Sequence, residues 1–302
     1  MDLFPKVPHT VTFSRIQMNQ VARGDSLHVV FEGDDDVDMA KRMFSKCGRP
    51  VHWIVGYGRV NCLRVHELCK TRNVPRVLVV VDSDYGRKLN TLEDPELVAY
   101  TDLNDMECTV LAVDPVVERH QEEFVEPSRV QECLADCGRD SLFSIVVERA
   151  ARLGAYRFVN QRDKRSLRFR NPKPASDIPY GNFIGSDPGF PWRDDVFREW
   201  FASRNCDKSE DVASLCDAVD GLLLESSAHL EWCQGHDLLA VYAVIHARLN
   251  DRPGFIPRQG KNLEAFIRER LSPGRLKSTE VFRRVESFLG WELPADAVPS
   301  LQ

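Results

Sequence analysis

The chain reads Leu27-His28-Val29-Val30-Phe31-Glu32-Gly33-Asp34-Asp35-Asp36 near its start and Val77-Leu78-Val79-Val80-Val81-Asp82-Ser83-Asp84 further along. Each stretch is a short apolar run that ends in carboxylates, which is typical of a buried parallel strand with acids in the loop at its carboxyl end. Side by side, two such strands bring Glu32, Asp36, Asp82 and Asp84 into one small volume. Four carboxylates repel one another unless a divalent cation holds them, and ligation by oxygen alone selects Mg²⁺ or Mn²⁺. The two stretches therefore predict a site for one or two such ions.

The acids also have a plainer reading. A single carboxylate after a strand commonly caps the next helix or binds turn amides, and Asp34, Asp35 and Asp36 are ordinary residues for the start of a helix. The combination of Glu32-Gly33 at one strand end with Asp82-x-Asp84 at another favours a metal site over this reading. Which of the three consecutive aspartates is a ligand stays open.

The composition restricts the class of protein. The 302 residues carry a formal charge of −6, and the longest apolar runs are only strand-sized. Without a membrane-span pattern or a charged and apolar leader, we expect a cytoplasmic protein. The nine cysteines show no CxxC pair or zinc spacing, so reduced core thiols are expected. The sequence contains no Walker A motif, so any ATP hydrolysis would come from a partner.

The order of elements predicts an α/β fold. We expect helices over 12–23, 35–47 and 61–71 and strands over 52–55 and 77–81, with Asn61 as a helix cap and a further strand near 98–102 that leads into a helix. This alternation indicates a parallel sheet flanked by helices, in which ligands sit outside the carboxyl ends of the strands. Asp102 and Glu107 would lie near that edge as weaker candidates for a second ion. Lys88 is a candidate phosphate contact, although a solvated surface lysine is the simpler interpretation.

The second part of the chain reads as mostly helical. We expect helices over 129–153 and near 194–204, 208–231, 237–250, 261–271 and 278–289, and a division into a metal-binding domain at 1–125 and a helical domain at 126–302. Within the second domain, 156–170 has the pattern of a basic β-ribbon with a turn near Asp163. Arginines interleaved with aromatic residues suit contacts to RNA, although a charged hairpin is as often only a solvated face. The candidate nucleic-acid contacts are Arg157, Arg162, Lys164, Arg165, Arg168, Arg170 and His236. For His236, in Gly235-His236-Asp237, the plainer reading is a turn and N-cap.

The strand-end acids resemble the TOPRIM fold shared by topoisomerases, bacterial primases and OLD-family nucleases, over roughly residues 25–115. A closer resemblance, over most of the chain, is to a family of small TOPRIM-like proteins typified by AriB, the effector of the PARIS anti-phage system. The shared motifs are Glu32-Gly33-x-x-Asp36, Asp82-Ser83-Asp84, Tyr100-Thr101-Asp102 with Glu107, and Gly235-His236-Asp237-Leu238. The run of three aspartates after Gly33 departs from the commoner wording of the family.

The resemblance implies a nuclease effector that an ATPase of the AriA kind holds silent and that cleaves transfer RNA as a homodimer once released. By motif, Glu32 is the central metal ligand and a catalytic residue together with Asp82 and Asp84, while Asp36 completes one or two Mg²⁺ sites. Two rivals stay open: an OLD-like nuclease that nicks DNA, and a non-catalytic adaptor that binds a partner ATPase. An enzyme that ligates or polymerises at phosphates is disfavoured because a nucleotide-binding motif is missing.

Overall fold

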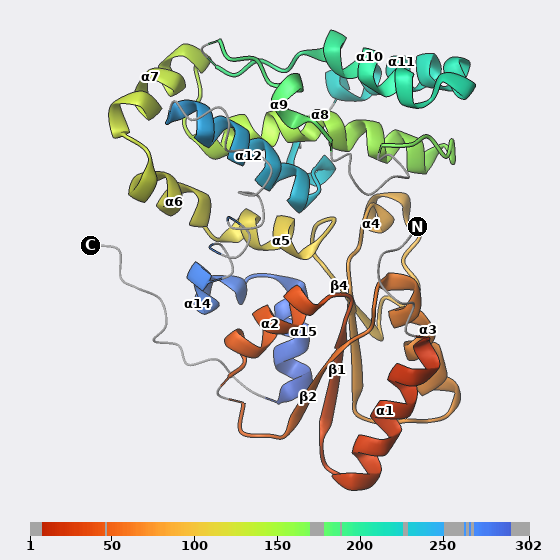
Figure 1. The fold of residues 1–302 in the computed structure, drawn as a ribbon. Helices are drawn as coiled ribbons and strands as arrows, with labels where there is room; N and C mark the ends of the chain where they lie inside the picture. The colour runs from red at the N-terminus through yellow and green to blue at the C-terminus, as the bar shows by residue number, and fades with distance from the viewer. Residues whose placement is uncertain are drawn as a thin grey trace. The chain divides into compact units, whose positions relative to one another are not determined.

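The protein is described by a computed structural model that covers residues 8–45, 47–169, 178–187, 189–225, 229–250, 263, 266 and 269–290. Two compact units make up these residues, a sheet unit within Asp2–Asp114 and Ser272–Gln302 and a helical unit within Pro115–Leu271. Figure 1 shows the order of the elements along the chain. The α/β class, with an all-parallel sheet flanked by helices and then a mostly helical part, is confirmed.

The sheet unit is built on four parallel strands in the order β2-β1-β3-β4. The strands are β1 (Leu27–Phe31), β2 (Val51–Val55), β3 (Val77–Val81) and β4 (Val98–Tyr100). Their connecting helices are α2 (Asp34–Met43), α3 (Arg59–Thr71) and α4 (Gly86–Leu89), and α1 (His9–Ala22) precedes β1. Because the chain turns from one side of β1 to the other between β2 and β3, the carboxyl ends of β1 and β3 flank the point where the strand order reverses.

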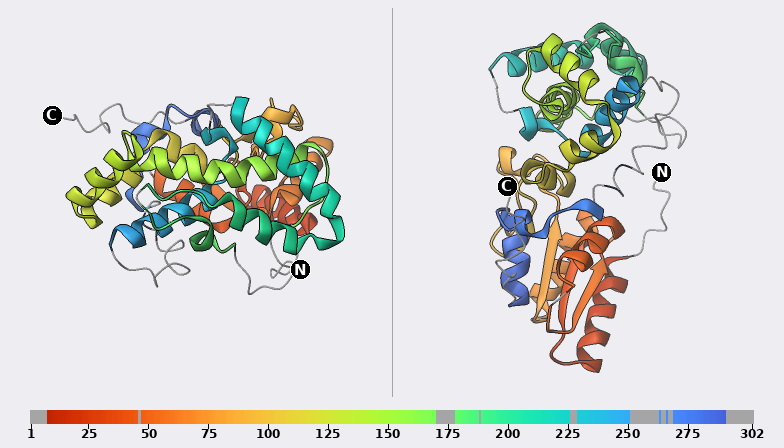
Figure 2. Two further views of the ribbon diagram at one scale, coloured as in Figure 1. Left: turned by 90° about the horizontal axis from the view of Figure 1, so that it is seen from above. Right: turned by 90° about the vertical axis from the view of Figure 1, so that its left-hand side faces the viewer.

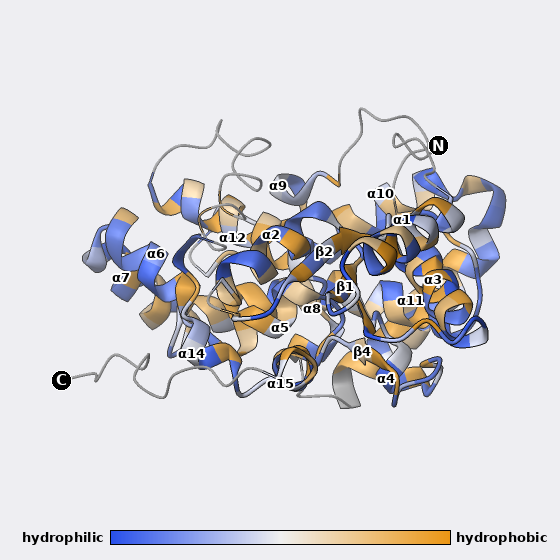
Figure 3. Ribbon diagram, turned by 90° about the horizontal axis from the view of Figure 1, so that it is seen from below, coloured by the Kyte–Doolittle hydropathy of each residue, from blue (hydrophilic) through white to orange (hydrophobic). Residues whose placement is uncertain are grey.

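Each face of the sheet is covered by helices. On one face, α1 and α3 bury Phe13, Ile16 and Val65 against strand residues such as Val30 and Val79. On the other face lie α2 and α15 (Glu280–Leu289), and the edge-on view shows the sheet between its two helical layers (Figure 2). Hydrophobic residues concentrate in the strands and alternate with hydrophilic ones along the helices (Figure 3). Continuous apolar strands are therefore explained by burial on both faces.

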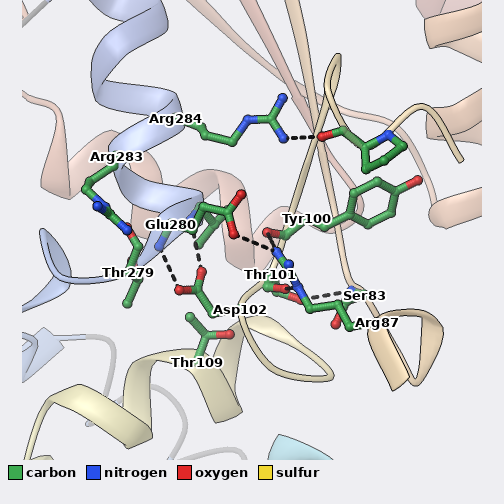
Figure 4. Close-up of polar contacts among 12 residues, drawn as sticks. Ser83, Arg87, Tyr100, Thr101, Asp102, Thr109, Thr279, Glu280, Arg283 and Arg284 are labelled. Carbon is green, nitrogen blue, oxygen red and sulfur yellow. Dashed lines mark hydrogen bonds and ion pairs between the residues drawn. The ribbon is translucent and has the colours of Figure 1, made fainter. Parts of the chain in front are cut away.

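The C-terminal helix α15 returns to the sheet unit and is anchored beside β4. Asp102, two residues after β4, accepts hydrogen bonds from the backbone N–H groups of Glu280 at 2.6 Å and Val281 at 2.9 Å. Arg284 donates to the carbonyl of Val98 at 2.7 Å, and Arg87 pairs with Glu280 at 3.2 Å. Figure 4 shows Asp102 and Arg87 at the start of α15, and it draws a second contact of Arg284, to the Pro95 carbonyl at 2.7 Å. Arg284 thus satisfies a backbone carbonyl of the last strand, and Asp102 fixes the start of α15 beside it.

The helical unit is organised around the long helix α8 (Leu142–Arg162). Its other elements are α6 (Val116–Phe124), α7 (Pro127–Cys137), α9 (Tyr180–Phe183), α10 (Asp194–Arg204), η1 (Cys206–Lys208), α11 (Ser209–Glu225), η2 (His229–Trp232) and α12 (Gly235–Leu249). Aromatic rings fill part of its core: Phe197 and Phe201 are buried next to Tyr156, and Phe183 packs against Phe197. At Gly154 the helix lies so close to η2 that an added Cβ would be 1.8 Å from the Trp232 carbonyl oxygen.

The expected basic β-ribbon over 156–170 is wrong. Residues 156–162 are the last two turns of α8, and the chain then turns at Asp163 and runs without regular structure to 169. Tyr156 and Phe158 alternate with Arg157 as in a strand, but Ala155, Tyr156, Phe158 and Val159 together line the buried side of the helix. The short alternation at these positions resembles strand periodicity but belongs to a longer helical pattern. Arg170 lies outside the described residues.

Two smaller expectations also differ from the structure, and a third lies mostly outside the described residues. Helix α3 begins at Arg59 with Gly58 at its N-cap, so Asn61 lies inside the helix and is not the cap. Contacts group α6 with the helical unit and α14 (Pro273–Leu276) and α15 with the sheet unit, unlike the division expected after residue 125. Most of the expected helix near 261–271 lies outside the described residues. Over the part of the chain that is described, none of the helices has the length and apolarity needed to cross a membrane.

Candidate functional site

The candidate site lies where β1 and β3 end, at the reversal of the strand order. Glu32 follows β1 directly and Asp82 follows β3, and the Asp82 backbone N–H donates a hydrogen bond to Glu32 Oε1 at 2.8 Å. The neighbouring strands β1 and β3 pair in register over His28↔Val77 to Val30↔Val79. The register and this hydrogen bond hold two of the predicted acids together on rigid strand ends.

Both acids are held in an environment that disfavours their charge. Burial raises the pKa of Glu32 to about 7, with further contributions from the charges of Asp84 and Asp36, while the hydrogen bond from Asp82 opposes the shift. Burial and the charge of Glu32 raise the pKa of Asp82 well above its usual value. Two neighbouring carboxylates whose pKa values rise together need a positive charge to ionise fully at neutral pH. The site is therefore short of compensating charge.

Among the three consecutive aspartates, the structure singles out Asp36. Asp34 and Asp35 are exposed, whereas Asp36 is half-buried and its Oδ2 accepts the Gly33 N–H at 3.2 Å. Its charge also contributes to the raised pKa values of Glu32 and Asp82. Of the three aspartates among which the sequence does not decide, Asp36 is thus the one whose charge acts on Glu32 and Asp82. Its carboxylate also closes the first turn of α2.

The second aspartate of the Asp82-Ser83-Asp84 motif has a cationic partner of its own. Asp84 Oδ2 pairs with Arg59 Nη1 at 2.8 Å, and the same Nη1 donates to the Ser83 carbonyl at 3.3 Å. The Asp84 backbone has a φ of 46° and donates its N–H to the Asn104 carbonyl at 2.7 Å. Asp82 therefore lies against Glu32, while Asp84 is paired with an arginine.

The acids after β4 divide into two groups. Both carboxylate oxygens of Asp102 accept hydrogen bonds from the N-terminus of α15, as described above, so Asp102 caps this helix. The charge of Glu107 contributes to the raised pKa of Asp82, and so does that of Asp105, the N-cap of α5 (Met106–Val113), which accepts the Cys108 N–H at 2.8 Å. Of the two weaker candidates from the sequence, Glu107 therefore lies toward the site, whereas Asp102 is engaged elsewhere.

Within the described ranges, no group of three or more His, Cys, Asp and Glu side chains is arranged to hold a metal ion. The oxygen donors themselves suit a hard cation, because Mg²⁺ commonly takes only one or two carboxylates and completes its shell with water and phosphate oxygens. Glu32 and Asp82 provide such a pair. The donor set therefore suits a cation bound by two carboxylates and completed by water better than a cation enclosed by four protein ligands.

The predicted basic residues lie in the helical unit and are largely paired there. Asp163 accepts hydrogen bonds from Arg162 at 2.7 Å and from Arg165 at 2.9 Å. Arg168 stays exposed at 59 %, with Asp207 at 4.0 Å, and Lys164 is exposed beside them with a φ of 52°. The positive charge of this surface is thus partly neutralised, most strongly at Arg162 and Arg165.

Two further candidates belong to a buried ion pair. Arg157 Nε lies 3.0 Å from Asp237 Oδ2, and Asp237 is 0 % exposed at the start of α12. His236 Nε2 lies 3.1 Å from the other carboxylate oxygen, which also accepts the Tyr180 hydroxyl. Despite burial, the charges of Arg157 and His236 lower the pKa of Asp237 far below its usual value. This cluster joins α8, α9 and α12, so Arg157 has a structural role that the sequence did not reveal.

Sequence reasoning missed Arg59 and Asp105. Asp105 follows the usual pattern of an N-cap, and its position five residues after β4 was the available signal. Arg59 follows the turn at Tyr57 and Gly58, whose φ values are 62° and 95°. No protein-family model and no curated protein matches this chain.

Proposed function

We propose that the chain is a metal-dependent phosphodiesterase that hydrolyses nucleic acid, with a TOPRIM-like sheet unit. The observation that carries the proposal is the contact between Glu32 and Asp82 at the carboxyl ends of β1 and β3. In parallel sheets, this reversal point is where ligands bind. Two charge-deficient carboxylates there favour a divalent cation and, through it, a phosphate substrate.

Glu32 and Asp82 are the residues that would hold the cation. Asp36 and Glu107 would lie close by and add negative charge without being its main ligands. A bound Mg²⁺ or Mn²⁺ supplies an activated water and offsets the charge that develops on the phosphate. The chain itself fixes the two carboxylates on strand ends and keeps them partly out of water. Rigid placement of this kind is what an in-line displacement at phosphorus requires.

Transfer RNA is the substrate that we favour, and anti-phage defence is the setting. The support is the set of motifs shared with AriB-type effectors, from Glu32-Gly33 to Gly235-His236-Asp237-Leu238. The same resemblance supports a partner ATPase of the AriA kind that restrains the nuclease, and a homodimer after release. An OLD-like action on DNA remains the main rival because it uses the same acids.

The test is to induce the wild-type chain, Glu32→Gln and the control Glu96→Gln, an exposed acid of the same unit, in a bacterial host. We expect the wild type and the control to stop growth and to produce discrete tRNA fragments, and Glu32→Gln to do neither. Sequencing of small RNA and inspection of chromosomal DNA give the readout. Broken DNA with intact tRNA would support the OLD-like rival. Identical behaviour of all three chains would contradict a catalytic role for Glu32.

A non-catalytic adaptor is the second candidate. It is favoured because the described residues include no group of three metal ligands and because Asp84 is paired with Arg59. In this case the acids would only shape the strand ends. Co-purification of a genetically linked ATPase with both the wild type and Glu32→Gln, together with an intact defence phenotype in the mutant, would support the adaptor over the nuclease.

A further inference from the structure

Arg59 is a cation that the fold brings into an otherwise acidic site. It is the first residue of α3, directly after the turn in which the Gly58 N–H donates to the Glu32 carbonyl at 3.0 Å. From this position its side chain reaches the loop after β3, where it pairs with Asp84 at 2.8 Å. Its guanidinium carbon also lies 5.7 Å from the centre of the Tyr100 ring. The turn at Tyr57 and Gly58 therefore aims an arginine from β2 across to the end of β3.

The pairing divides the acids into two sets. Asp84 is turned toward Arg59 by its left-handed backbone and by the bond from its N–H to the Asn104 carbonyl. Glu32 and Asp82 remain together without an arginine or lysine in hydrogen-bonding contact among the described residues. A second metal ion that took Asp84 as a ligand would have to compete with the guanidinium for this carboxylate. The existing cation already provides the compensation that such an ion would bring.

Arg59 also has hydrogen-bonding capacity to spare. Its contacts to Asp84 and to the Ser83 carbonyl both use Nη1, and its side chain is 22 % exposed. Within the described part of the chain, Nε and Nη2 make no hydrogen bond. A guanidinium presents its donors as a planar fork that matches two oxygens of a phosphate. The donors on Nε and Nη2 are therefore suited to bind an anionic oxygen.

We propose that Arg59 supplies the second positive charge of the site: it binds a non-bridging oxygen of the phosphodiester while it holds Asp84, so that Glu32 and Asp82 take a single divalent cation. The inference rests on the proposed phosphodiesterase function. It deepens that function by replacing the second metal ion of a two-metal site with a side chain of this chain.

The experiment compares the full-length wild type, Arg59→Lys, Arg59→Gln and the control Arg64→Gln, an exposed arginine on the same helix. Bound Mn²⁺ is counted by the loss of the free-ion EPR signal, without substrate, and cleavage of total tRNA is measured in parallel. Circular dichroism and thermal melting check that each variant folds. We expect one Mn²⁺ per chain in the wild type and in Arg64→Gln, with equal cleavage.

For Arg59→Gln we expect at least one Mn²⁺ to remain bound while cleavage falls about 100-fold, the size typical for a lost transition-state contact. Arg59→Lys should recover part of the loss because it keeps the charge but not the fork. Two Mn²⁺ per wild-type chain with active cleavage would overturn this inference and leave the proposed function intact, as would a folded Arg59→Gln with wild-type cleavage. A wild type that binds no Mn²⁺ and cleaves nothing would overturn both.

Discussion

The backbone N–H of Asp82 donates to Glu32 Oε1 over 2.8 Å, so the end of β3 holds the acid at the end of β1 in place. This bond favours the ionised form of Glu32, yet burial and the nearby carboxylates raise its pKa to about 7. Desolvation and repulsion therefore outweigh the hydrogen bond at this position. The consequence is a folding stability that depends on pH.

We expect Glu32→Gln to flatten the pH dependence of stability. The pKa of Glu32 is higher in the folded chain than in the unfolded chain, so the folded state binds more protons and stability falls as pH rises from about 4.5 to 7. The loss is up to about 3 kcal/mol in the free energy of unfolding at pH 8. Urea denaturation at pH 5 and pH 8 measures it, with Glu96→Gln as control. Equal pH slopes in wild type and Glu32→Gln would contradict the prediction.

His28 should have the opposite effect at lower pH. Its ring is fully buried and stacks on His52 at 5.0 Å, and burial and the charge of His52 lower its pKa to about 4. The unfolded state therefore binds the extra proton, and stability falls as pH drops from about 6.5 to 4.

We expect His28→Phe to remove this acid sensitivity and to be more stable than wild type at pH 4.5 by about 2 kcal/mol. This is less than the free energy that corresponds to the full pKa shift of His28. Thermal melts from pH 4.5 to 7.5 measure the difference. A wild-type pH slope in the variant would show that His28 does not titrate in this way.

Asp102 should matter for the attachment of α15 and not for cation binding. Asp102→Ala removes the acceptor for two N–H groups at the start of that helix, which should cost about 1–2 kcal/mol. Asp38→Ala, which removes an exposed pair with Lys41, should cost less than about 0.5 kcal/mol. Hydrogen exchange of the 281–289 amides and urea midpoints provide the readout. Loss of Mn²⁺ binding in folded Asp102→Ala would argue against a purely capping role.

Arg157 should affect stability where Arg168 does not. Arg157→Gln leaves the buried Asp237 without its main partner and should cost about 3–5 kcal/mol. Arg168→Gln changes an exposed side chain and should leave the melting temperature nearly unchanged while it weakens binding to tRNA. The two measurements separate a fold-stabilising arginine from a candidate RNA contact. Arg168→Gln with unaltered RNA affinity would remove this surface from the proposed interface.

The close approach of α8 to η2 predicts opposite effects for two similar substitutions. Gly→Ala within a helix normally stabilises by up to about 1 kcal/mol, and Gly221→Ala in α11 should do so because nothing lies within 4 Å of the added Cβ. Gly154→Ala would place Cβ 1.8 Å from the Trp232 carbonyl oxygen and should destabilise strongly. Thermal melts of both variants decide the matter; stabilisation by Gly154→Ala would refute this packing.

The strands and the position of the central acids were predictable from local sequence. Val77–Val81 is an unbroken apolar run, and Leu27–Phe31 is apolar apart from the buried His28, because both faces of the sheet are covered. Acids directly after such strands meet at one edge of the sheet. The partners of the acids were not predictable. Arg59 reaches Asp84 across 25 positions and α15 reaches Asp102 across 178, and no local pattern specifies such contacts.

The basic segment 156–170 shows why a local pattern can also predict the wrong secondary structure. Tyr156, Arg157 and Phe158 alternate as a strand would, yet they belong to a helix of 21 residues whose buried stripe is broad. A window that began at Leu142 would have favoured the helix, because hydrophobic residues recur there at helical spacing. The charge of Arg157 then found a buried partner at Asp237, a contact that only the folded helical unit creates.

The buried carboxylate of Asp114 accepts the Ser272 backbone N–H at 2.7 Å, which places the exit from the sheet unit beside the re-entry. The whole segment 115–271 therefore leaves and returns at one spot, like a long insertion in a surface loop. The entropic cost of closing such a long connection is modest, because this cost rises only slowly with the length of the loop. The helical unit is thus inserted between two neighbouring points of the sheet unit, so the strand order and the acids at its reversal point do not depend on its length.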